Sequence, residues 1–240
     1  MIRHLLSQAV ERCGYEITRS SKTPGPTLAG IAGLPIETIL DVGANRGQFA
    51  RQVLRLFPRA NVYCFEPLPD ALAHLRSWAD AESLSNVTTL QLALGSANET
   101  AEMFVHVDHD ASSSLLSTTE RTRTLYAQTA RQSRTTVQVR TLDALVDEGA
   151  VRLSAGTLLK IDVQGYELEV LRGARQSLRR IEASIVEVGL QPLYDTQGSF
   201  FAVAELLNEA GLRYAGNAAQ VCDSLGRVVY VDAAFVRIAF

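Results

Sequence analysis

The stretch Asp41-Val-Gly-Ala-Asn-Arg-Gly47 follows the apolar run Ile36–Leu40 directly and leads into an amphipathic segment. An apolar strand that ends in a glycine-bearing turn and continues as a helix is typical of a loop that holds a ligand. Glycine suits such a turn because its backbone can approach a ligand closely or adopt a positive φ. The spacing Gly43-x-x-x-Gly47 differs from the G-x-G-x-x-G spacing of dinucleotide-binding proteins. We therefore favour another adenosine-bearing ligand, although the turn alone is compatible with NAD, a phosphate or S-adenosylmethionine.

Apolar strands and amphipathic helices alternate along most of the chain. This alternation predicts a parallel sheet with helices on both faces and with ligands bound outside the carboxyl ends of the strands. The predicted main strands are Ile36–Val42, Asn61–Phe65, Val87–Leu94, Thr157–Val163 and Ala183–Val188. Shorter strands are predicted at Leu212–Ala215, Val228–Val231 and Ala233–Ala239, and helices around 49–57, 72–79, 168–178 and 200–207.

The chain divides into an N-terminal stretch and one α/β domain. Residues 1–19 carry apolar residues at helical spacing and residues 20–33 are rich in Pro and Gly, so residues 1–33 are predicted as a helix and a linker. Residues 34–240 suit a single domain. A Ser-, Thr- and Arg-rich insertion at about 100–140 interrupts it, with extra strands at Ala101–Val107 and Val137–Val139. This insertion is either a mobile cover with cationic substrate contacts or a solvated loop.

The composition narrows the class of function. Of the 240 residues, 47% are hydrophobic, which can fill a sizeable core. The net charge of −3 gives no overall attraction to nucleic acid or to an anionic membrane. The 3 cysteines are not spaced for a metal site and suit reduced thiols in a cytoplasm. We find neither a convincing signal peptide nor about 18 consecutive apolar residues, so we expect a cytoplasmic protein without a transmembrane segment.

An acidic residue, Glu66, directly follows the second predicted strand. In a sheet of this kind, a carboxylate at that strand end accepts hydrogen bonds from the two ribose hydroxyls of an adenosine ligand. The alternative is a carboxylate that caps the next helix. Because the glycine-bearing turn lies upstream, we favour the ribose-binding role.

Two further carboxylates are candidates for the chemistry. Asp162 lies at the carboxyl end of a buried strand, where an acid is unfavourable unless it has a partner or a function. Glu187 lies near the end of the next strand, so the two side chains can face one cleft if those strands are neighbours. Such a pair can hold a hydroxyl, share a proton or bind a hard cation, although we can nominate too few oxygen ligands for a metal site. The alternative for Asp162 is a structural acid paired with backbone amides or with Lys160.

Four motifs together indicate a known group of enzymes. They are Asp41-Val-Gly-Ala-Asn45-Arg-Gly47, Phe65-Glu66-Pro67, Lys160-Ile-Asp162-Val-Gln-Gly165-Tyr-Glu167 and Val170-Leu-Arg-Gly-Ala174. Through them, residues 36–240 closely resemble the FkbM-type S-adenosylmethionine-dependent methyltransferases, and Ser113-Ser114-Leu115 looks like a serine-bearing segment of that family. The resemblance implies a Rossmann-like class I methyltransferase fold, in which a mostly parallel seven-stranded sheet has an antiparallel last strand.

The resemblance also implies S-adenosylmethionine as methyl donor and, as acceptor, a hydroxyl of a sugar, glycan, glycolipid or natural product. Carried over residue by residue, the donor would be bound by Asp41, Gly43, Asn45 and Gly47 on its methionine and ribose side, by Glu66 at the ribose, and by Ala93 and Leu94 at the adenine. Asp162 would lie beside the transferring methyl group. For the base that receives the hydroxyl proton, Asp162 is the first candidate, Glu187 the second and His109, in the insertion, the third.

Other functions stay open at this point. The chain could methylate an amine of a small acceptor, or it could be a nicotinamide-dependent oxidoreductase, although the glycine pattern and catalytic pair of such an enzyme are not evident. A nucleic-acid methyltransferase would show a basic face, and a non-catalytic scaffold would bind the donor without methylating an acceptor. We expect a small-molecule or glycan acceptor and no nucleic acid. We assign no metal-binding residues, and whether the activity depends on a metal stays open. The N-terminal helix could serve assembly into a homo-oligomer.

Overall fold

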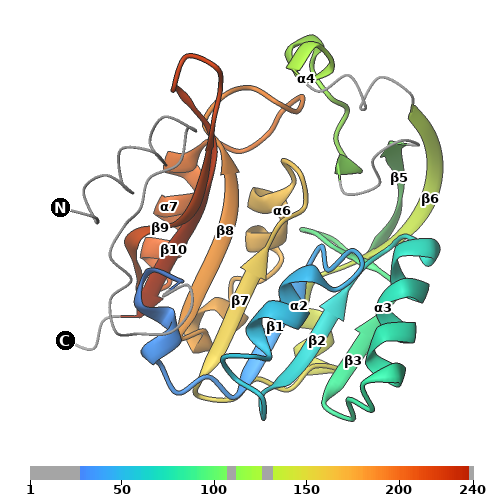
Figure 1. The fold of residues 1–240 in the computed structure, drawn as a ribbon, viewed down its shortest axis with the longest axis vertical. Helices are drawn as coiled ribbons and strands as arrows, with labels where there is room; N and C mark the ends of the chain where they lie inside the picture. Colours follow the sequence, from blue (N-terminus) through green and yellow to red (C-terminus); the bar gives the residue numbers. More distant parts are fainter. Residues whose placement is uncertain (1–27, 107–111, 126–131, 238–240) are drawn as a thin grey trace, which may run out of the picture.

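The main sheet has seven strands in the order β3-β2-β1-β7-β8-β10-β9. The computed structural model describes residues 28–106, 112–125 and 132–237 (Figure 1). The strands are β1 (Thr38–Val42), β2 (Asn61–Phe65), β3 (Val87–Leu90), β7 (Thr157–Ile161), β8 (Ala183–Gly189), β9 (Leu212–Cys222) and β10 (Val228–Arg237). Strands β3, β2, β1, β7 and β8 pair in parallel, whereas β10 runs antiparallel to both β8 and β9. The predicted mostly parallel sheet with an antiparallel last strand is confirmed.

The central strands β1 and β7 are apolar on both faces of the sheet. Every residue of each strand is buried. Successive side chains of a strand point to opposite faces, so Ile39 packs into the core on one face and its neighbour Leu40 into the core on the other. A strand that is covered on both faces appears in the sequence as a continuous apolar run, which is why these two strands could be predicted.

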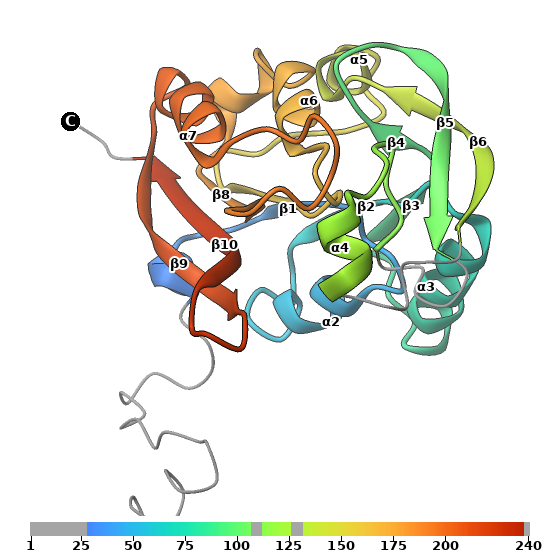
Figure 2. The same cartoon turned by 90° about the horizontal axis from the view of Figure 1, so that it is seen from above.

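Helices cover both faces of the main sheet (Figure 2). One face carries α2 (Gln48–Val53), α3 (Pro69–Ala81) and the 3₁₀ helix η1 (Leu28–Gly33), and the other carries α5 (Leu142–Asp147), α6 (Glu167–Arg172), η4 (Ser177–Arg180) and α7 (Phe200–Glu209). The helix α3 begins at Pro69, whose fixed φ suits the first turn. The last residues of the predicted linker form η1. The helix predicted at residues 1–19 lies outside the described residues and stays a prediction.

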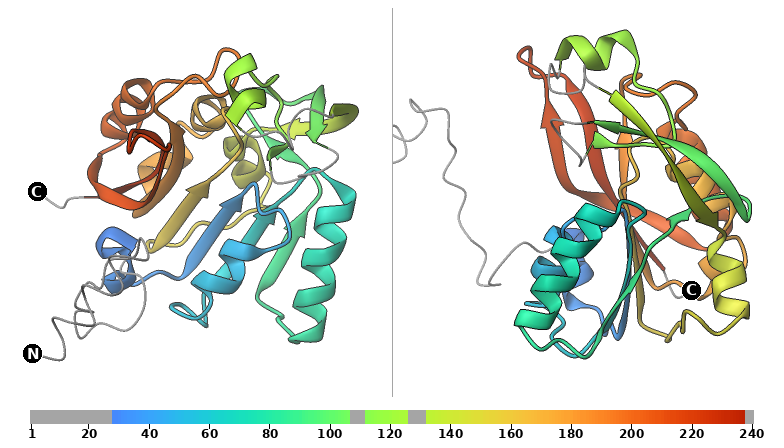
Figure 3. Two further views of the ribbon diagram at one scale, coloured as in Figure 1. Left: turned by 45° about the horizontal axis from the view of Figure 1, so that its top comes forward. Right: turned by 90° about the vertical axis from the view of Figure 1, so that its right-hand side faces the viewer.

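The predicted insertion contributes two strands to a second, three-stranded sheet. Its strands β4 (Ala93–Leu94), β6 (Gln132–Arg140) and β5 (Glu99–His106) pair in that order. The short helix α4 (Glu120–Leu125) lies between β5 and β6 in the sequence. Figures 1 and 3 show that these elements lie at the end of the main sheet where β1, β2 and β7 finish. The insertion is therefore placed where ligands bind in folds of this kind.

The single strand predicted at Val87–Leu94 is wrong. The chain forms β3 and β4 there, and the two belong to different sheets. The carbonyl of Leu90 accepts a hydrogen bond from the amide of Glu66, after which the chain leaves the main sheet and Ala93 and Leu94 pair with β6. Because apolar residues continue through both strands, the hydrophobic pattern does not reveal the change of partner.

The elements after β7 also differ in length from their predictions. Strands β9 and β10 form one long hairpin instead of the short strands predicted there, and most side chains of β9 are exposed. The helix predicted around 168–178 is divided into α6 and η4. At Gly173, directly after α6, a Cβ atom would lie 1.9 Å from the carbonyl oxygen of Gly95, so close backbone packing needs glycine here.

Within the described residues, no helix combines the length and apolar character that crossing a membrane requires.

Candidate functional site

The glycine-bearing turn after β1 packs directly against the turn after β7. Gly43 has a φ of 79°, and a Cβ atom on it would lie 1.9 Å from the backbone oxygen of Asp162. The amides of Gly43 and Ala44 both donate to the carbonyl of Phe65 at 3.0 Å, which ties the turn to the end of β2 as well. Asn45 also adopts a positive φ of 46°. The turn therefore holds three strand ends together, and a side chain at position 43 is excluded.

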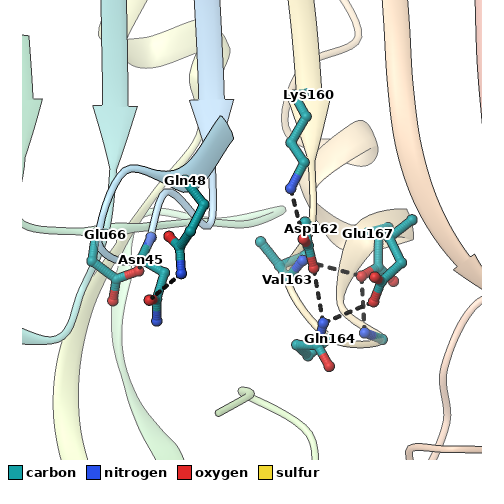
Figure 4. Close-up of polar contacts among 10 residues, drawn as sticks. Asn45, Gln48, Glu66, Lys160, Asp162, Val163, Gln164 and Glu167 are labelled. Atoms are coloured by element: carbon teal, nitrogen blue, oxygen red, sulfur yellow. Dashed lines mark hydrogen bonds and ion pairs between the residues drawn. The ribbon is translucent and has the colours of Figure 1, made fainter. Parts of the chain in front are cut away.

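Glu66 connects this turn to the end of β2. Its side chain is buried, with 4% of the residue exposed. One carboxylate oxygen accepts a hydrogen bond from the amide of Asn45 and the other accepts one from the amide of Leu68, both at 2.8 Å. Figure 4 shows Glu66 beside Asn45. These two amides fix the orientation of the carboxylate, whose oxygens can each accept more than one hydrogen bond.

One pocket brings together most of the residues predicted to bind the donor. Its wall contains Gly43, Asn45, Glu66, Ala93 and Leu94, together with the predicted base Asp162. Apolar and aromatic side chains from the main sheet and from the insertion complete it, namely Val42, Phe65, Leu68, Met103, Leu115, Val163 and Tyr166. A mostly apolar pocket with a few convergent polar groups is the usual form of a small-molecule site.

Two residues of the predicted donor set do not line this pocket. Gly47 packs against Leu75 and Trp78 and has a φ of 83°, so it shapes the start of α2. Asp41 is fully buried in β1, and neither of its carboxylate oxygens has a hydrogen-bond partner among the described residues. Burial raises the pKa of Asp41 to about 6, although the cation of Lys160 opposes this rise. Asp41 is therefore a buried acid that lies directly behind the residues of the pocket wall, Val42 and Gly43.

Asp162 forms an ion pair with Lys160, two residues earlier in the chain. The Nζ atom of Lys160 lies 2.6 Å from Oδ2 of Asp162. Burial opposes the charged form of Lys160, but the carboxylates of Asp162 and Asp41 outweigh it and raise the pKa of the ammonium above its usual value. Burial likewise opposes the charge of Asp162, yet Lys160 and hydrogen bonds from neighbouring side chains hold the pKa of Asp162 below its usual value. Asp162 is therefore ionised near neutral pH.

Glu187 and Asp162 share a hydrogen-bond partner, Gln164. The side-chain amide nitrogen of Gln164 donates to Oδ1 of Asp162 at 2.8 Å (Figure 4). It also donates to Oε1 of Glu187 at 2.7 Å. Burial, followed by the charges of Asp162 and Glu167, raises the pKa of Glu187 well above its usual value. Of the two predicted bases, Asp162 is thus the one whose charged, proton-accepting form is stabilised, whereas the surroundings of Glu187 disfavour its charge.

Glu167 stabilises the turn between Asp162 and α6. Its Oε1 atom accepts hydrogen bonds from the amides of Val163 at 3.2 Å and Gly165 at 2.9 Å. Burial raises the pKa of Glu167 to about 7. The turn itself is unusual, because Gln164 has a φ of 58° and Gly165 one of 98°. Within the described residues, no three His, Cys, Asp or Glu side chains are arranged to hold a metal ion.

Two segments that lie far apart in the sequence cover this turn, and we call them the roof, residues 112–122 and 190–198. They bind each other through Thr119, whose hydroxyl donates to the carbonyl of Pro192 at 2.8 Å, and through Arg121, which donates to the side-chain oxygen of Gln191. They also bind Gln164: the hydroxyl of Ser114 donates to its carbonyl oxygen at 2.7 Å and that of Tyr194 to its side-chain oxygen at 2.5 Å. The described part of the insertion is thus docked over the site.

The roof contacts were not predicted from the sequence, and one predicted residue cannot be placed. Tyr194 and Gln164 are neutral, and no periodic pattern connects them across the chain. The serine-bearing segment Ser113-Ser114-Leu115 was the part of the sequence that indicated a role for this region. Two of its residues, Ser113 and Leu115, line the pocket. His109, the third candidate base, lies outside the described residues.

Comparison with known proteins identifies the family. A family model described as the methyltransferase FkbM domain matches residues 41–214, which contain the turn, Glu66, Asp162 and the roof. The chain belongs to this family, and it is a methyltransferase. The resemblance seen in the sequence motifs is confirmed.

Two relatives of this methyltransferase carry specific names. It is 30% identical over 178 residues to the 2-O-methyltransferase NoeI of Sinorhizobium fredii, which covers 72% of each chain. It is 28% identical over 178 residues to the hexuronic acid methyltransferase AglP of Haloferax volcanii, covering 73% of this chain and 63% of that protein.

A solved structure shares the fold of this methyltransferase. The M. capricolum protein TrmK in complex with S-adenosyl-homocysteine has a TM-score of 0.50 at 8% identity, over 90% of this chain and 70% of that one. At this low identity the similarity concerns the fold alone.

Proposed function

We propose that the protein is an S-adenosylmethionine-dependent O-methyltransferase that methylates a hydroxyl of a sugar, glycan, glycolipid or natural product. The observation that carries this proposal is that Glu66 and Asp162 line the same pocket. Glu66 suits the ribose of an adenosine donor, and Asp162 suits the hydroxyl that receives the methyl group. The names of the two relatives, a 2-O-methyltransferase and a hexuronic acid methyltransferase, support a sugar as acceptor.

The residues of the pocket fit the proposed donor. The carboxylate of Glu66 is held by two backbone amides and can accept hydrogen bonds from a ribose diol. Leu94 and Phe65 offer apolar surface to an adenine ring. S-adenosylmethionine supplies a methyl group that is already activated by a positively charged sulfur. The ionised Asp162 in the pocket wall and the buried Asp41 behind it favour such a positive charge.

Asp162 then has one task in the reaction, which is to receive a proton. An acceptor hydroxyl that donates a hydrogen bond to Asp162 would pass its proton to that carboxylate as its oxygen forms a bond to the methyl carbon. The bond between that carbon and the donor sulfur would break at the same time, with S-adenosylhomocysteine as the leaving group. A weak base suffices for this step because the hydroxyl becomes strongly acidic only while the new bond forms. Lys160 keeps Asp162 ionised, and Ser114 of the roof binds the backbone of Gln164 beside it.

The first test measures ligand binding. We expect S-adenosylhomocysteine to bind in isothermal titration calorimetry and to raise the melting temperature, because it carries the same ribose and adenine as the donor. NAD is the matched comparison, since it also carries an adenosine. Binding of NAD without binding of S-adenosylhomocysteine would overturn the proposal in favour of an oxidoreductase.

The second test identifies the acceptor group. The enzyme is incubated with methyl-labelled S-adenosylmethionine and a panel of neutral sugars, uronic acids and amino sugars. A product whose label survives mild alkali and is chromatographically a methyl ether supports O-methylation of a hydroxyl. An alkali-labile label would indicate a methyl ester and a basic labelled product would indicate an amine, and either of them would contradict the proposed hydroxyl acceptor.

A further inference from the structure

Gln164 lies at the point where the roof meets the two carboxylates. Its side chain bridges Asp162 and Glu187, and its backbone and side-chain oxygens accept hydrogen bonds from Ser114 and Tyr194. Its φ of 58° is rare for a residue other than glycine, so the surrounding contacts hold a backbone that is otherwise unfavourable.

The hydrogen-bond partners fix which way the amide group of Gln164 faces. Its nitrogen has two protons, and the two carboxylate oxygens at 2.8 Å and 2.7 Å can accept them. Its oxygen can only accept, and the hydroxyl of Tyr194 donates to it at 2.5 Å. Rotating the amide by half a turn would place its oxygen against the carboxylates and leave the tyrosine facing a nitrogen. The two acids therefore set the orientation in which Gln164 donates to both of them, and the hydroxyl of Tyr194 holds the side-chain oxygen in place by donating to it.

We propose that Gln164 is a positioning residue for Asp162, and that Tyr194 holds its side-chain amide in the orientation that the reaction needs. This inference rests on the proposed function, in which Asp162 receives the proton of the acceptor. When the roof is docked, Ser114 fixes the backbone of Gln164 and Tyr194 fixes its side chain. The amide then holds the carboxylate of Asp162 in place and supports its negative charge.

The effect of Gln164 must be separated from that of the other charged groups around Asp162. Lys160 faces it from β7, Glu187 from β8, Asp232 from β10 and Asp41 from β1, and Glu167 lies on α6. Lys160, Gln164 and a hydrogen bond from Glu187 lower the pKa of Asp162, whereas burial and the charges of Asp41 and Asp232 oppose its ionised form. A residue that acts only by stabilising the fold would leave the titration of Asp162 unchanged, so that titration distinguishes the two roles.

The experiment measures the titration of Asp162 directly. The protein is labelled with ¹³C at the aspartate carboxyl carbons, and the signal of Asp162 is assigned as the one that is lost in Asp162→Asn. We expect Gln164→Met to raise the apparent pKa of Asp162 by about one unit, since a hydrogen bond to the charged form is removed. Tyr194→Phe keeps the amide but frees its orientation, so we expect a smaller rise in the same direction.

Two matched variants serve as controls. Tyr214→Phe removes a tyrosine hydroxyl that bonds to Asn217 on the exposed strand β9, and Gln138→Met removes an amide that bonds to Thr100 in the second sheet. Neither control should change the titration of Asp162. An unchanged pKa of Asp162 in folded Gln164→Met would overturn the inference. If Gln164→Met does not fold, Tyr194→Phe decides in the same way, because loss of one hydroxyl leaves the packing of the ring intact.

Calorimetry with S-adenosylhomocysteine, on the same variants, separates this inference from the proposed function. We expect Tyr194→Phe to bind it with less than about a threefold change, since Tyr194 does not line the pocket. If the wild-type protein does not bind it at all, the proposed function fails, while the carboxyl titration still tests the role of Gln164. A titration that moves only in the two control variants would likewise refute that role.

Discussion

At the scale of single residues, Glu66 combines two tasks whose chemical requirements differ. Its oxygens hold the turn after β1 through the amides of Asn45 and Leu68, and they face the pocket. Glu66→Gln keeps the size of the side chain but replaces one acceptor oxygen by a donor. We expect binding of S-adenosylhomocysteine to weaken about 10-fold to 100-fold, because a charged hydrogen-bond acceptor is lost. Isothermal titration calorimetry measures this change.

The control for Glu66 lies on an exposed strand of the second sheet. Glu102→Gln removes a surface carboxylate that pairs with Arg134, at a site where more than half of each side chain is exposed. It should leave the affinity unchanged. Equal affinities of wild type and Glu66→Gln would show that Glu66 is structural and does not bind the ribose.

Asp162 should separate turnover from donor binding. Asp162→Asn keeps the shape of the side chain and can still accept a hydrogen bond from Lys160, but an amide cannot take up a proton. We expect turnover on the acceptor to fall at least about 100-fold, while affinity for S-adenosylhomocysteine stays within a few fold. Steady-state kinetics and calorimetry measure the two effects.

The control is Asp223→Asn, which removes the partner of Arg227 in the turn between β9 and β10. This variant should keep its turnover. If Asp162→Asn also keeps full turnover, the proton goes elsewhere, and the assignment of Asp162 as base is wrong.

At the scale of elements, the contact between the turns after β1 and β7 depends on Gly43. The variant Gly43→Ala combines a positive φ of 79° with a Cβ atom only 1.9 Å from the backbone oxygen of Asp162. We expect the free energy of unfolding to fall by at least about 3 kcal/mol, the sum of a left-handed backbone and overpacking against main chain. Denaturant unfolding measures this loss.

Gly226 offers a matched comparison for Gly43. It has a φ of 76° in the turn between β9 and β10, but a Cβ atom added there would meet no described atom within 4 Å. Gly226→Ala should therefore cost only the backbone term of about 1 to 2 kcal/mol. Equal losses in the two variants would mean that the two turns are not in tight contact.

The elements that could be predicted are those whose signal is local in the sequence. The buried run lies directly before the glycine-bearing turn, and Glu66 and Asp162 each directly follow the strand that they end, so a short stretch of sequence is enough to predict each of them. The roof is different, because the partners of Gln164 are 50 and 30 residues away in the chain. No pattern in a single sequence pairs a serine, a tyrosine and a glutamine over that distance.

Strand β9 is hard to predict for another reason, because its sequence lacks the alternating or continuous apolar pattern of a strand. Its middle consists of the small and polar residues 215–220, and nearly all of them are at least partly exposed. It is held by its pairing with β10 and not by an apolar face. Only its two ends, around Leu212 and at Val221 and Cys222, carry apolar residues, and these are too far apart to predict one continuous strand.

At the scale of the whole molecule, the site concentrates ionisable groups in the core at the ends of the central strands. Asp41, Lys160 and Glu167 are all buried there, with Asp162 beside them. Burial of charge opposes folding unless a partner compensates it. Lys160 compensates Asp162 and, in part, Asp41, whereas Glu167 relies on the amides of its own turn. The buried ionisable groups of the site therefore lower the free energy of unfolding, and we expect the size of this loss to depend on pH.

The sign of this dependence follows from Glu167. Its pKa is raised by burial from 4.5 to about 7, so between these pH values the folded state keeps a proton that the unfolded chain has lost. A rise in pH across this window therefore favours unfolding, and the loss of stability levels off above about pH 7.

We expect wild type to lose up to about 3 kcal/mol of stability relative to Glu167→Gln between pH 4.5 and pH 8, because glutamine can still accept both amide hydrogen bonds but does not titrate. Urea unfolding of both proteins at several pH values measures the difference, in which contributions from Asp41 and Asp162 largely cancel. Glu205→Gln, on the exposed face of α7, should run parallel to wild type at every pH. Parallel curves for Glu167→Gln and wild type would instead mean that Glu167 is ionised throughout and that its turn is open to water.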